Sequence, residues 1–309
     1  MENLSFQFKA ATTYRRHGGR LAVAVSVAAF LCSSFPASAG PILGSDGDLA
    51  AFAVLAGTPG VTNVPTSTIY GDLGSTNTGG ANGGGYIFPI PPGGSVQANT
   101  GLAIGAQADL TAAITYLNGL PSSALGGTLL GAGGITSVGP GIWTGAASVT
   151  GAFTLQGNGT PNETWIFLTN GLTLNVGSTM SINNAGSDPS VYWVDASSVA
   201  IDSLVADPTT FLGNFLALTS ITVGADATDA CGRLLASTGT VTLISDTIGN
   251  DCTSLGLNSN GLAGGSSGTT PVPEPSSLAL FGGALLGLLG LAVQQRRARL
   301  PQGSRRAIG

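Results

Sequence analysis

Residues 221–243 read ITVGADATDACGRLLASTGTVTL. The stretch begins with the triplet Ile221-Thr222-Val223 and ends with the triplet Val241-Thr242-Leu243. A strand points successive side chains to opposite faces, so each triplet turns its two apolar residues inward and its threonine outward. The two threonines are about 20 residues apart, a period typical of a β-solenoid, in which each coil stacks its apolar side chains on the next.

Two more triplets have the same form: Phe153-Thr154-Leu155 and Leu172-Thr173-Leu174. Their threonines have nearly the same separation, which again suits one coil. The interval from Thr173 to Thr222, however, is about two and a half times as long, which is not a whole number of such coils. The pattern therefore predicts a mainly β domain that is either an irregular solenoid or a β-sandwich.

One segment carries a helical pattern instead. Its apolar residues recur at three-to-four spacing, on the stripe Leu102, Ala106, Leu110, Ala113, Ile114 and Leu117. Asn99 or Thr100 can cap the start, and Asn118-Gly119 followed by Pro121 can end it. Gly101 and Gly105 weaken the first turn, so the pattern predicts a helix over Ala106–Leu117.

Charge separates the body of the chain from its ends. Between Gly40 and Glu274 there are thirteen acidic residues, one basic residue (Arg233) and neither lysine nor histidine. Seryl catalysis by a Ser-His-Asp or Ser-Lys arrangement is therefore excluded in this body. A net charge of −12 also repels nucleic acid, which is excluded as a partner.

The N-terminus has the three parts of a secretory signal peptide, predicted over residues 1–39. Its basic residues Lys9, Arg15, Arg16 and Arg20 precede an apolar run from Leu21 to Leu31. Ala37-Ser38-Ala39 supplies the small-residue cleavage site, so we expect cleavage between Ala39 and Gly40. The residues after Arg16 lack the hydrophobicity of a twin-arginine signal, which favours Sec export.

A second composite signal lies at the C-terminus, over residues 272–299. Pro273-Glu274-Pro275 is followed by an apolar segment, residues 278–293, and then by arginines at 296, 297 and 299. The segment can form a membrane helix whose flanking arginines hold residues 300–309 in the cytoplasm. A plain anchor has this form, but the order of the three parts resembles the PEP-CTERM sorting signal. That resemblance implies cleavage near the Pro-Glu-Pro by an exosortase-type enzyme, and release to the cell surface or the exopolysaccharide layer.

Between the signals we expect one domain over residues 40–253 and a flexible Gly/Ser-rich linker over residues 254–271. Cys32 is lost with the signal peptide, which leaves Cys231 and Cys252 in an oxidising compartment. An exported pair predicts a disulfide, with two buried free thiols as the alternative.

Several phrases of the domain, taken in order, resemble the ice-binding-protein-like family once catalogued as DUF3494. They include FAVLAG at 52–57, GDLG at 71–74, GAFTL at 151–155, VYWV at 191–194 and GRLLA at 232–236. The resemblance covers roughly Leu49 to Ile248. It implies an irregular, discontinuous β-solenoid of triangular section with one long helix packed alongside. Arg233 lies in the GRLLA phrase, where we expect it to bind a carboxylate or carbonyl groups.

The resemblance also implies a function, binding to ice, whereas the lack of histidine and lysine in the body predicts no enzymatic activity. Small hydroxyl-bearing side chains on a flat β-face can order water, and the body has no strongly hydrated lysine and a single glutamate, Glu163. Outward threonines are nevertheless ordinary on β-sheets. The residues predicted to form an ice-binding plane are Thr154, Thr173, Asn175, Thr222, Thr240 and Thr242.

Other chemistries have weaker support. Two carboxylates are enough for a glycosidase, but most acids here lie in turn contexts such as Asp188-Pro189. Asp46-Gly47-Asp48 and Asp226-Ala227-Thr228-Asp229 supply oxygens for calcium without matching a known calcium loop, so no metal or cofactor is expected. The main rival to ice binding is an adhesive role in the exopolysaccharide matrix, in which Trp143, Trp165 and Trp193 stack on sugars. Their apolar neighbours favour core positions instead.

Overall fold

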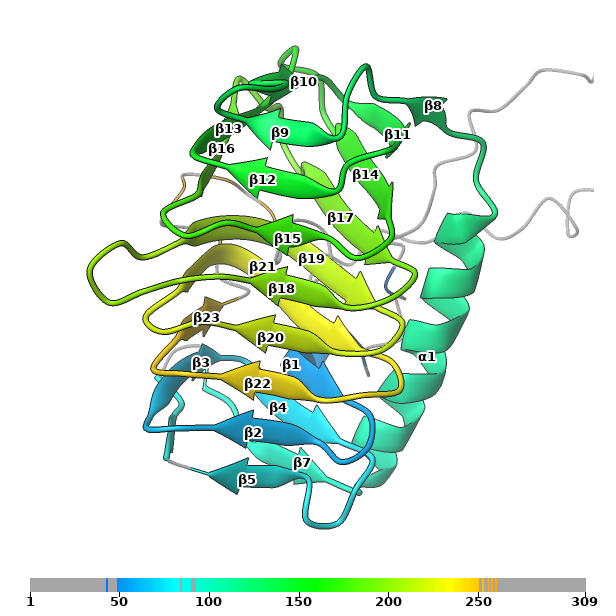
Figure 1. Cartoon of the computed structure of the whole chain (residues 1–309). Coiled ribbons are helices and arrows are strands. Elements are labelled where there is room, and N and C mark those ends of the chain that lie inside the picture. The colour runs from blue at the N-terminus through cyan, green and yellow to red at the C-terminus, as the bar shows by residue number, and fades with distance from the viewer. Residues whose placement is uncertain are drawn as a thin grey trace, which may run out of the picture. The chain divides into compact units, whose positions relative to one another are not determined.

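The computed structural model describes residues 43, 49–83, 85–89, 93–249, 252, 255, 257 and 259. The signal peptide, most of the linker, the sorting signal and the Asp46-Gly47-Asp48 turn lie outside these residues. The described chain forms a β-solenoid of three faces with one long helix alongside (Figure 1). The strands of neighbouring coils pair in parallel. Stacked solenoid coils require parallel pairing, so the β-sandwich alternative is wrong.

The first face, called here the helix-covered face, lies beneath the helix. Its central part consists of the C-terminal halves of two long strands, β19 and β21. The strands are β8 (Ser123–Ala124), β11 (Gly141–Thr144), β14 (Thr164–Thr169), β17 (Ser190–Asp195), β19 (Thr210–Ala217), β21 (Thr228–Ala236), β1 (Phe52–Ala56), β4 (Asp72–Ser75) and β7 (Val96–Ala98).

The second face is a separate sheet, called here the eight-stranded face. Figure 1 shows it toward the viewer, with the helix to its right. In spatial order its strands are β5 (Ala81–Gly83), β2 (Val61–Asn63), β22 (Val241–Leu243), β20 (Ile221–Val223), β18 (Val199–Ile201), β15 (Thr173–Leu174), β12 (Ser148–Thr150) and β9 (Leu129–Gly131).

The third face shares a sheet with the helix-covered face because β19 and β21 bend from one face to the other. At the bend the pairing of the two strands shifts register, between Phe211 and Gly213 of β19. The remaining strands of the third face are β10 (Ser137–Val138), β13 (Ala152–Gln156), β16 (Thr179–Asn183), β23 (Thr247–Gly249), β3 (Ser67–Tyr70) and β6 (Tyr86–Ile87).

The solenoid is discontinuous in sequence. The last strands of the domain stack directly on its first ones, since β22 pairs with β2 and β23 pairs with β3. Strand β1 pairs with β21 on one side and with β4 on the other. The N-terminal segment therefore supplies the coils that follow the C-terminal ones, and the helix carries the chain back to the opposite end (Figure 1).

The predicted helix is present, and it begins before Ala106, the first residue of the predicted range. Helix α1 runs over Gly101–Asn118, and Thr100 caps it by accepting a hydrogen bond from the amide of Ala103. A short 3₁₀ helix, η1 (Leu49–Ala51), lies beside it. The stripe buries Ala106, Leu110 and Leu117 in a cluster that also holds outward residues of the helix-covered face. Within the described residues no helix is long and apolar enough to span a membrane.

Inside the solenoid, apolar side chains from all three faces form the main core. Aromatic rings line part of it, with Trp193 stacked between Phe167 and Phe215 at centroid separations of 4.1 and 5.7 Å. Trp165 and Trp193 are fully buried, and Trp143 packs partly buried against the same core. The interpretation as core residues is therefore confirmed for Trp165 and Trp193, whereas Trp143 lies at the edge of the core.

The coils have unequal lengths, which explains the irregular repeat. Thr222 and Thr242 are direct neighbours on adjacent strands, as their spacing predicts. Thr173 pairs with Ala200, and Ala200 pairs in turn with Thr222. The interval from Thr173 to Thr222 is therefore two coils, each longer than the coil from Thr222 to Thr242. The interval from Thr154 to Thr173 is not a coil, because Thr154 belongs to the third face.

Candidate functional site

The eight-stranded face carries a column of paired outward residues that runs from one edge to the other. Each member is the direct cross-strand partner of the next, so the column follows the stacking direction of the coils. In spatial order it consists of Leu129, Ser148, Thr173, Ala200, Thr222, Thr242, Thr62 and Asn82.

The column points outward because its neighbours in each strand point inward. Ile221 and Val223 are buried on either side of Thr222, and Val241 and Leu243 are buried on either side of Thr242. Adjacent strands lie about 4.8 Å apart, so the hydroxyl and methyl groups of neighbouring threonines repeat at that interval. The helix packs on a different face and leaves this one uncovered (Figure 1).

A second column lies two residues earlier in the chain, directly before strands β18, β20 and β22, and contains Ser198, Ser220 and Thr240. It follows from the same register, in which Val199 pairs with Ile221 and Ile221 with Val241. The hydroxyl of Ser198 lies 3.3 Å from that of Ser220 and 2.7 Å from that of Thr219. Side-chain hydroxyls in and beside this column therefore bond to one another along the stacking direction.

The structure brings together five of the six residues predicted for the ice-binding plane. Thr173, Thr222 and Thr242 lie in the first column, and Thr240 lies in the second. Asn175 follows β15 on the same face, where its amide donates to the hydroxyl of Thr150 at 2.7 Å and to the carbonyl of Val149 at 3.1 Å.

Thr154 is the residue that does not belong to this group. It lies in β13 on the third face, between Ser137 and Ser181. Its hydroxyl is 3.1 Å from that of Ser181. The sequence triplet predicted its outward direction, but a triplet alone does not identify the face.

Sequence reasoning missed Ser148, Thr62 and Asn82 of the first column. Thr62 lies in Val61-Thr62-Asn63, where the second inward residue is a buried asparagine rather than an aliphatic side chain. That asparagine donates to the carbonyl of Gly85 at 2.8 Å and accepts from Ser67 at 2.7 Å, so its polar atoms are satisfied inside the solenoid. The alternation of inward and outward residues was the available signal for Thr62, and the buried asparagine at position 63 obscured it.

The third face carries a register-aligned column of its own. Its threonines pair in the order Thr179, Thr210, Thr228, Thr247 and Thr68, between Ala152 and Ile87 at its ends. None of these threonines was among the predicted site residues. Threonine columns on two faces show that the column itself does not identify the binding face.

Several carboxylates hold turns together. Glu163 accepts from the amides of Asn158 at 2.6 Å and Gly186 at 3.0 Å. Asp195 is fully buried and accepts from the amides of Gly171 and Leu172 and from the hydroxyl of Thr169. In the described part of the chain, no group of three or more His, Cys, Asp and Glu residues is arranged to hold a metal.

Asp246 has the same structural role and an altered acidity. It is buried, and it accepts from the amides of Ala227 at 2.9 Å and Ile244 at 2.7 Å. Burial raises its pKa from 3.8 to about 7, although the two backbone hydrogen bonds oppose that rise. The nearby Asp226 carboxylate raises the pKa further.

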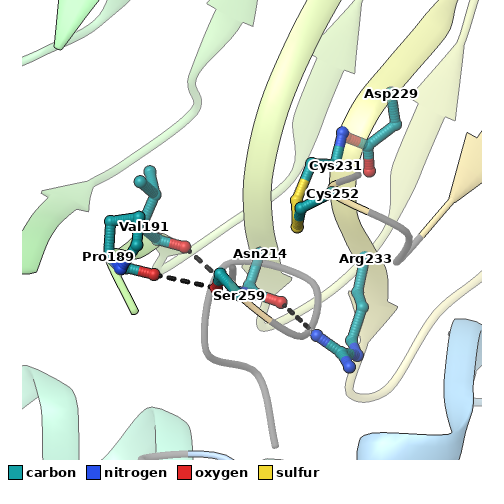
Figure 2. The surroundings of a disulfide bond; sticks show 8 residues. All are labelled: Pro189, Val191, Asn214, Asp229, Cys231, Arg233, Cys252 and Ser259. Atoms are coloured by element: carbon teal, nitrogen blue, oxygen red, sulfur yellow. Dashed lines mark hydrogen bonds between the residues drawn. A yellow bond between two sulfur atoms is a disulfide. The ribbon is translucent and has the colours of Figure 1, made fainter. Parts of the chain in front are cut away.

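Arg233 is buried beside the disulfide (Figure 2). Its guanidinium donates to the Asn214 side-chain oxygen at 3.0 Å and to the Ala50 carbonyl at 3.1 Å. Burial lowers its pKa from 12.5 to about 10, which leaves it protonated at neutral pH. Burial also raises the pKa of Asp229 well above its usual range, against the backbone bond from Cys231 and the charge of Arg233. Arg233 thus links η1 to the bend of the long strands.

The predicted disulfide joins Cys231 in β21 to Cys252 beyond β23, across a sequence separation of 21 (Figure 2). Both cysteines lie in the main core, with at most 1% of their surface exposed. The alternative of two free thiols is therefore wrong for this structure.

The sequence and the fold are similar to those of known proteins. Residues 54–249 match the ice-binding-like family, and residues 271–297 match the PEP-CTERM protein-sorting motif. An ice-binding protein of Nostoc sp. (strain HG1) is 35% identical over 243 residues, which cover 77% of this chain and 82% of that protein.

Two solved structures have the same fold. An ice-binding protein from the Antarctic ascomycete Antarctomyces psychrotrophicus aligns with a TM-score of 0.55 and 27% identity, over 69% of this chain and 99% of that one. The DUF3494 domain of Shewanella frigidimarina ice-binding protein 1 aligns with a TM-score of 0.52 and 25% identity, over 68% of this chain and 97% of that one. The discontinuous solenoid, its helix and the family match agree, and this chain belongs to the ice-binding-like family, with a PEP-CTERM sorting motif at its C-terminus.

Proposed function

We propose that this protein binds ice through its eight-stranded face, without enzymatic activity. The observation that carries the proposal is that the column from Ser148 to Asn82 runs unbroken across seven strands of a separate sheet that no bend interrupts. Relatives described as ice-binding proteins support the choice of ligand. The site residues are Thr173, Thr222, Thr240 and Thr242, with Ser148, Thr62 and Asn82 added from the register and Asn175 at the margin.

The physical basis is a rigid array of small side chains. Parallel strands fix the hydroxyl and methyl groups at about 4.8 Å intervals, so ordering them costs little conformational entropy on binding. Threonine is also branched at Cβ, which restricts its side-chain torsion. The body has no lysine, and its one glutamate is only 5% exposed and bonded to backbone amides. Lysine and exposed glutamate, whose strong hydration would disrupt ordered water, are thus absent from the described residues of this face.

The eight-stranded face is preferred over the third face for two reasons. It is a sheet of its own whose column runs through strands of two or three residues each, without the bend that interrupts β19 and β21. The third face has a large exposed apolar side chain in line with its threonines, since Ile87 is 53% exposed and pairs with Thr68.

The test compares two tyrosine substitutions. Thr222→Tyr places a bulky ring in the middle of the proposed site, and Thr154→Tyr places the same ring on the third face. Both residues lie on the outer surface of the solenoid, where substitutions usually change stability by no more than about 0.5 kcal/mol. We expect Thr222→Tyr to abolish inhibition of ice recrystallisation and Thr154→Tyr to retain it, with unchanged circular dichroism spectra for both. The reverse result would move the site to the third face.

An adhesive role in the exopolysaccharide matrix is the alternative if the unmodified protein has no effect on ice growth. The PEP-CTERM motif favours that setting. Trp165 and Trp193 are fully buried and cannot stack on sugars, so Trp143, which is partly buried, is the one of the three with surface left for that contact. Pull-down on the polysaccharide of the producing cells distinguishes the two functions.

We also propose how the protein reaches its site of action. The chain is exported and cut after Ala39, is held briefly in the inner membrane by residues 278–293, and is then cleaved near Pro273-Glu274-Pro275 by an exosortase-type enzyme. The sorting motif supports this sequence of events. Mass spectrometry of surface material should find an N-terminus at Gly40 and no peptide containing Arg296–Arg299, and an intact chain to Gly309 would contradict the second cleavage.

A further inference from the structure

One carboxylate, that of Asp202, stands beside the proposed ice-binding columns. The residue directly after each of five neighbouring strands of the eight-stranded face occupies one shared position, two residues after the first column. The register of these strands brings the five residues side by side, and they are called here the edge column. In spatial order the edge column consists of Val64, Ile244, Gly224, Asp202 and Asn175, of which Asp202 is the charged member.

Asp202 points outward from the face. Val199, Ile201 and Ser203 are buried, whereas Asp202 is exposed, so the alternation of β18 continues into the turn that follows it. Asp202 is therefore on the same side as Ala200 of the first column. Strand β18 lies between β20 and β15 in the middle part of the eight-stranded face (Figure 1). The carboxylate thus borders the proposed site along its length, away from the two ends of the solenoid.

The backbone around Asp202 is held firmly. Its amide donates to the carbonyl of Leu174 at 2.8 Å, and its carbonyl accepts from the hydroxyl of Thr209 at 2.6 Å. The hydroxyl of Ser203, the next residue, donates to the carbonyl of Ala225 at 2.8 Å and accepts from the amide of Thr209 at 3.0 Å. A short side chain on this fixed backbone keeps its carboxylate close to the edge of the face.

The neighbours in the edge column leave the carboxylate to water. Gly224 has no side chain, and a Cβ at that position would lie 2.5 Å from the amide nitrogen of Ser203, so a larger residue does not fit there. Asn175, on the other side, donates its side-chain amide to the hydroxyl of Thr150 at 2.7 Å. Within the described part of the chain, no hydrogen bond is formed to the side chain of Asp202, which is therefore hydrated.

A hydrated carboxylate is a poor neighbour for an ice-like layer of water. An ionised carboxylate only accepts hydrogen bonds, so the water molecules around it all turn a hydrogen toward it. Each water molecule in ice donates two hydrogen bonds and accepts two. Hydroxyl and amide side chains both donate and accept, and they can join such a network. Stripping water from the carboxylate instead costs the desolvation of a charge.

We infer that Asp202 limits the strength of ice binding: its carboxylate keeps liquid-like water at the edge of the eight-stranded face beside β18 and weakens the contact of the neighbouring coils with ice. The inference rests on the proposed function, because it concerns the same face. It has a distinctive consequence, since removal of this charge should strengthen ice binding, whereas a bulky substitution in the columns should weaken it.

Asp202→Asn tests the inference with little change in shape. Asparagine has nearly the same volume as aspartate, and Asn175 already occupies the neighbouring position of the edge column. The matched control is Asp207→Asn, which removes the same charge from an exposed position in the same turn, on the part that leads to the third face. In the full chain we expect Asp202→Asn to inhibit ice recrystallisation at a severalfold lower concentration than the unmodified protein. Asp207→Asn should leave that concentration unchanged.

A double variant shows where the gain arises. Thr222→Tyr blocks the eight-stranded face, so Asp202→Asn added to it should give no gain. The inference is overturned if Asp202→Asn has no effect or weakens inhibition, if Asp207→Asn strengthens it equally, or if the gain persists beside Thr222→Tyr. Circular dichroism checks that each variant is folded. Absence of inhibition by the unmodified protein is a separate result, which would refute the proposed function and the inference with it.

Discussion

The buried carboxylate of Asp246 should make the protein more stable in mild acid than in mild base. Its pKa is about 7 in the folded protein against an ordinary value of 3.8. The folded state thus binds the proton more tightly than the unfolded state, so the stabilisation is complete below pH 3.8 and is lost as the pH rises through 7. Between pH 5 and pH 8 this one group should change the free energy of unfolding by about 3 kcal/mol.

Asp246→Asn isolates that contribution. Asparagine keeps the volume and one oxygen that can accept from Ala227 or Ile244, and it does not ionise. Guanidinium unfolding at pH 5 and pH 8 should show the difference in the unmodified protein, and the variant should lose about 3 kcal/mol of it. Asp109→Asn, on the exposed side of α1, is the control for removal of one negative charge. The reasoning is refuted if Asp246→Asn retains the same pH dependence as the unmodified protein.

Three further predictions concern the helix cap, the disulfide and bound cations. Thr100→Ala removes the cap of α1 and should cost about 1 kcal/mol in urea unfolding, whereas Thr100→Ser should cost less because it keeps the accepting oxygen. Alkylation of the denatured, non-reduced protein should label neither Cys231 nor Cys252, and replacing both by serine should lower the free energy of unfolding by about 3 kcal/mol. Chelation with EDTA should leave the circular dichroism spectrum and the unfolding midpoint unchanged, and a large loss of stability would indicate a structural cation.

The helix and the inward–outward alternation are predictable from sequence because each depends on local spacing. The stripe from Ala106 to Leu117 is buried as predicted, and Thr222 and Thr242 stand side by side as their spacing requires. Local spacing does not show how long the connections between the faces are. Thr154 and Thr173 are spaced like neighbours on adjacent coils, yet they lie on different faces because the chain between them passes through β14.

Which residues belong to the site was harder to predict from the sequence than the kind of side chain that the site carries. Thr62 and Asn82 precede the helix in sequence and join the column only because β2 pairs with β22. That pairing joins segments from opposite ends of the domain, and one sequence offers no signal for it. Arg233, by contrast, was correctly expected to bind carbonyl oxygen, since a lone buried cation requires such partners.

The joining of the first strands to the last ones has a consequence for biogenesis. Strands β2 and β3 need β22 and β23 as partners, and these are the last strands of the domain to be synthesised. Until they arrive, the early coil presents unpaired backbone groups along an open edge, and the contacts that close it are far apart in sequence. The domain therefore cannot complete its fold until β22 and β23 are available to pair with β2 and β3. For a chain that crosses a membrane unfolded from its N-terminus, this strand order delays folding until the last coil has crossed.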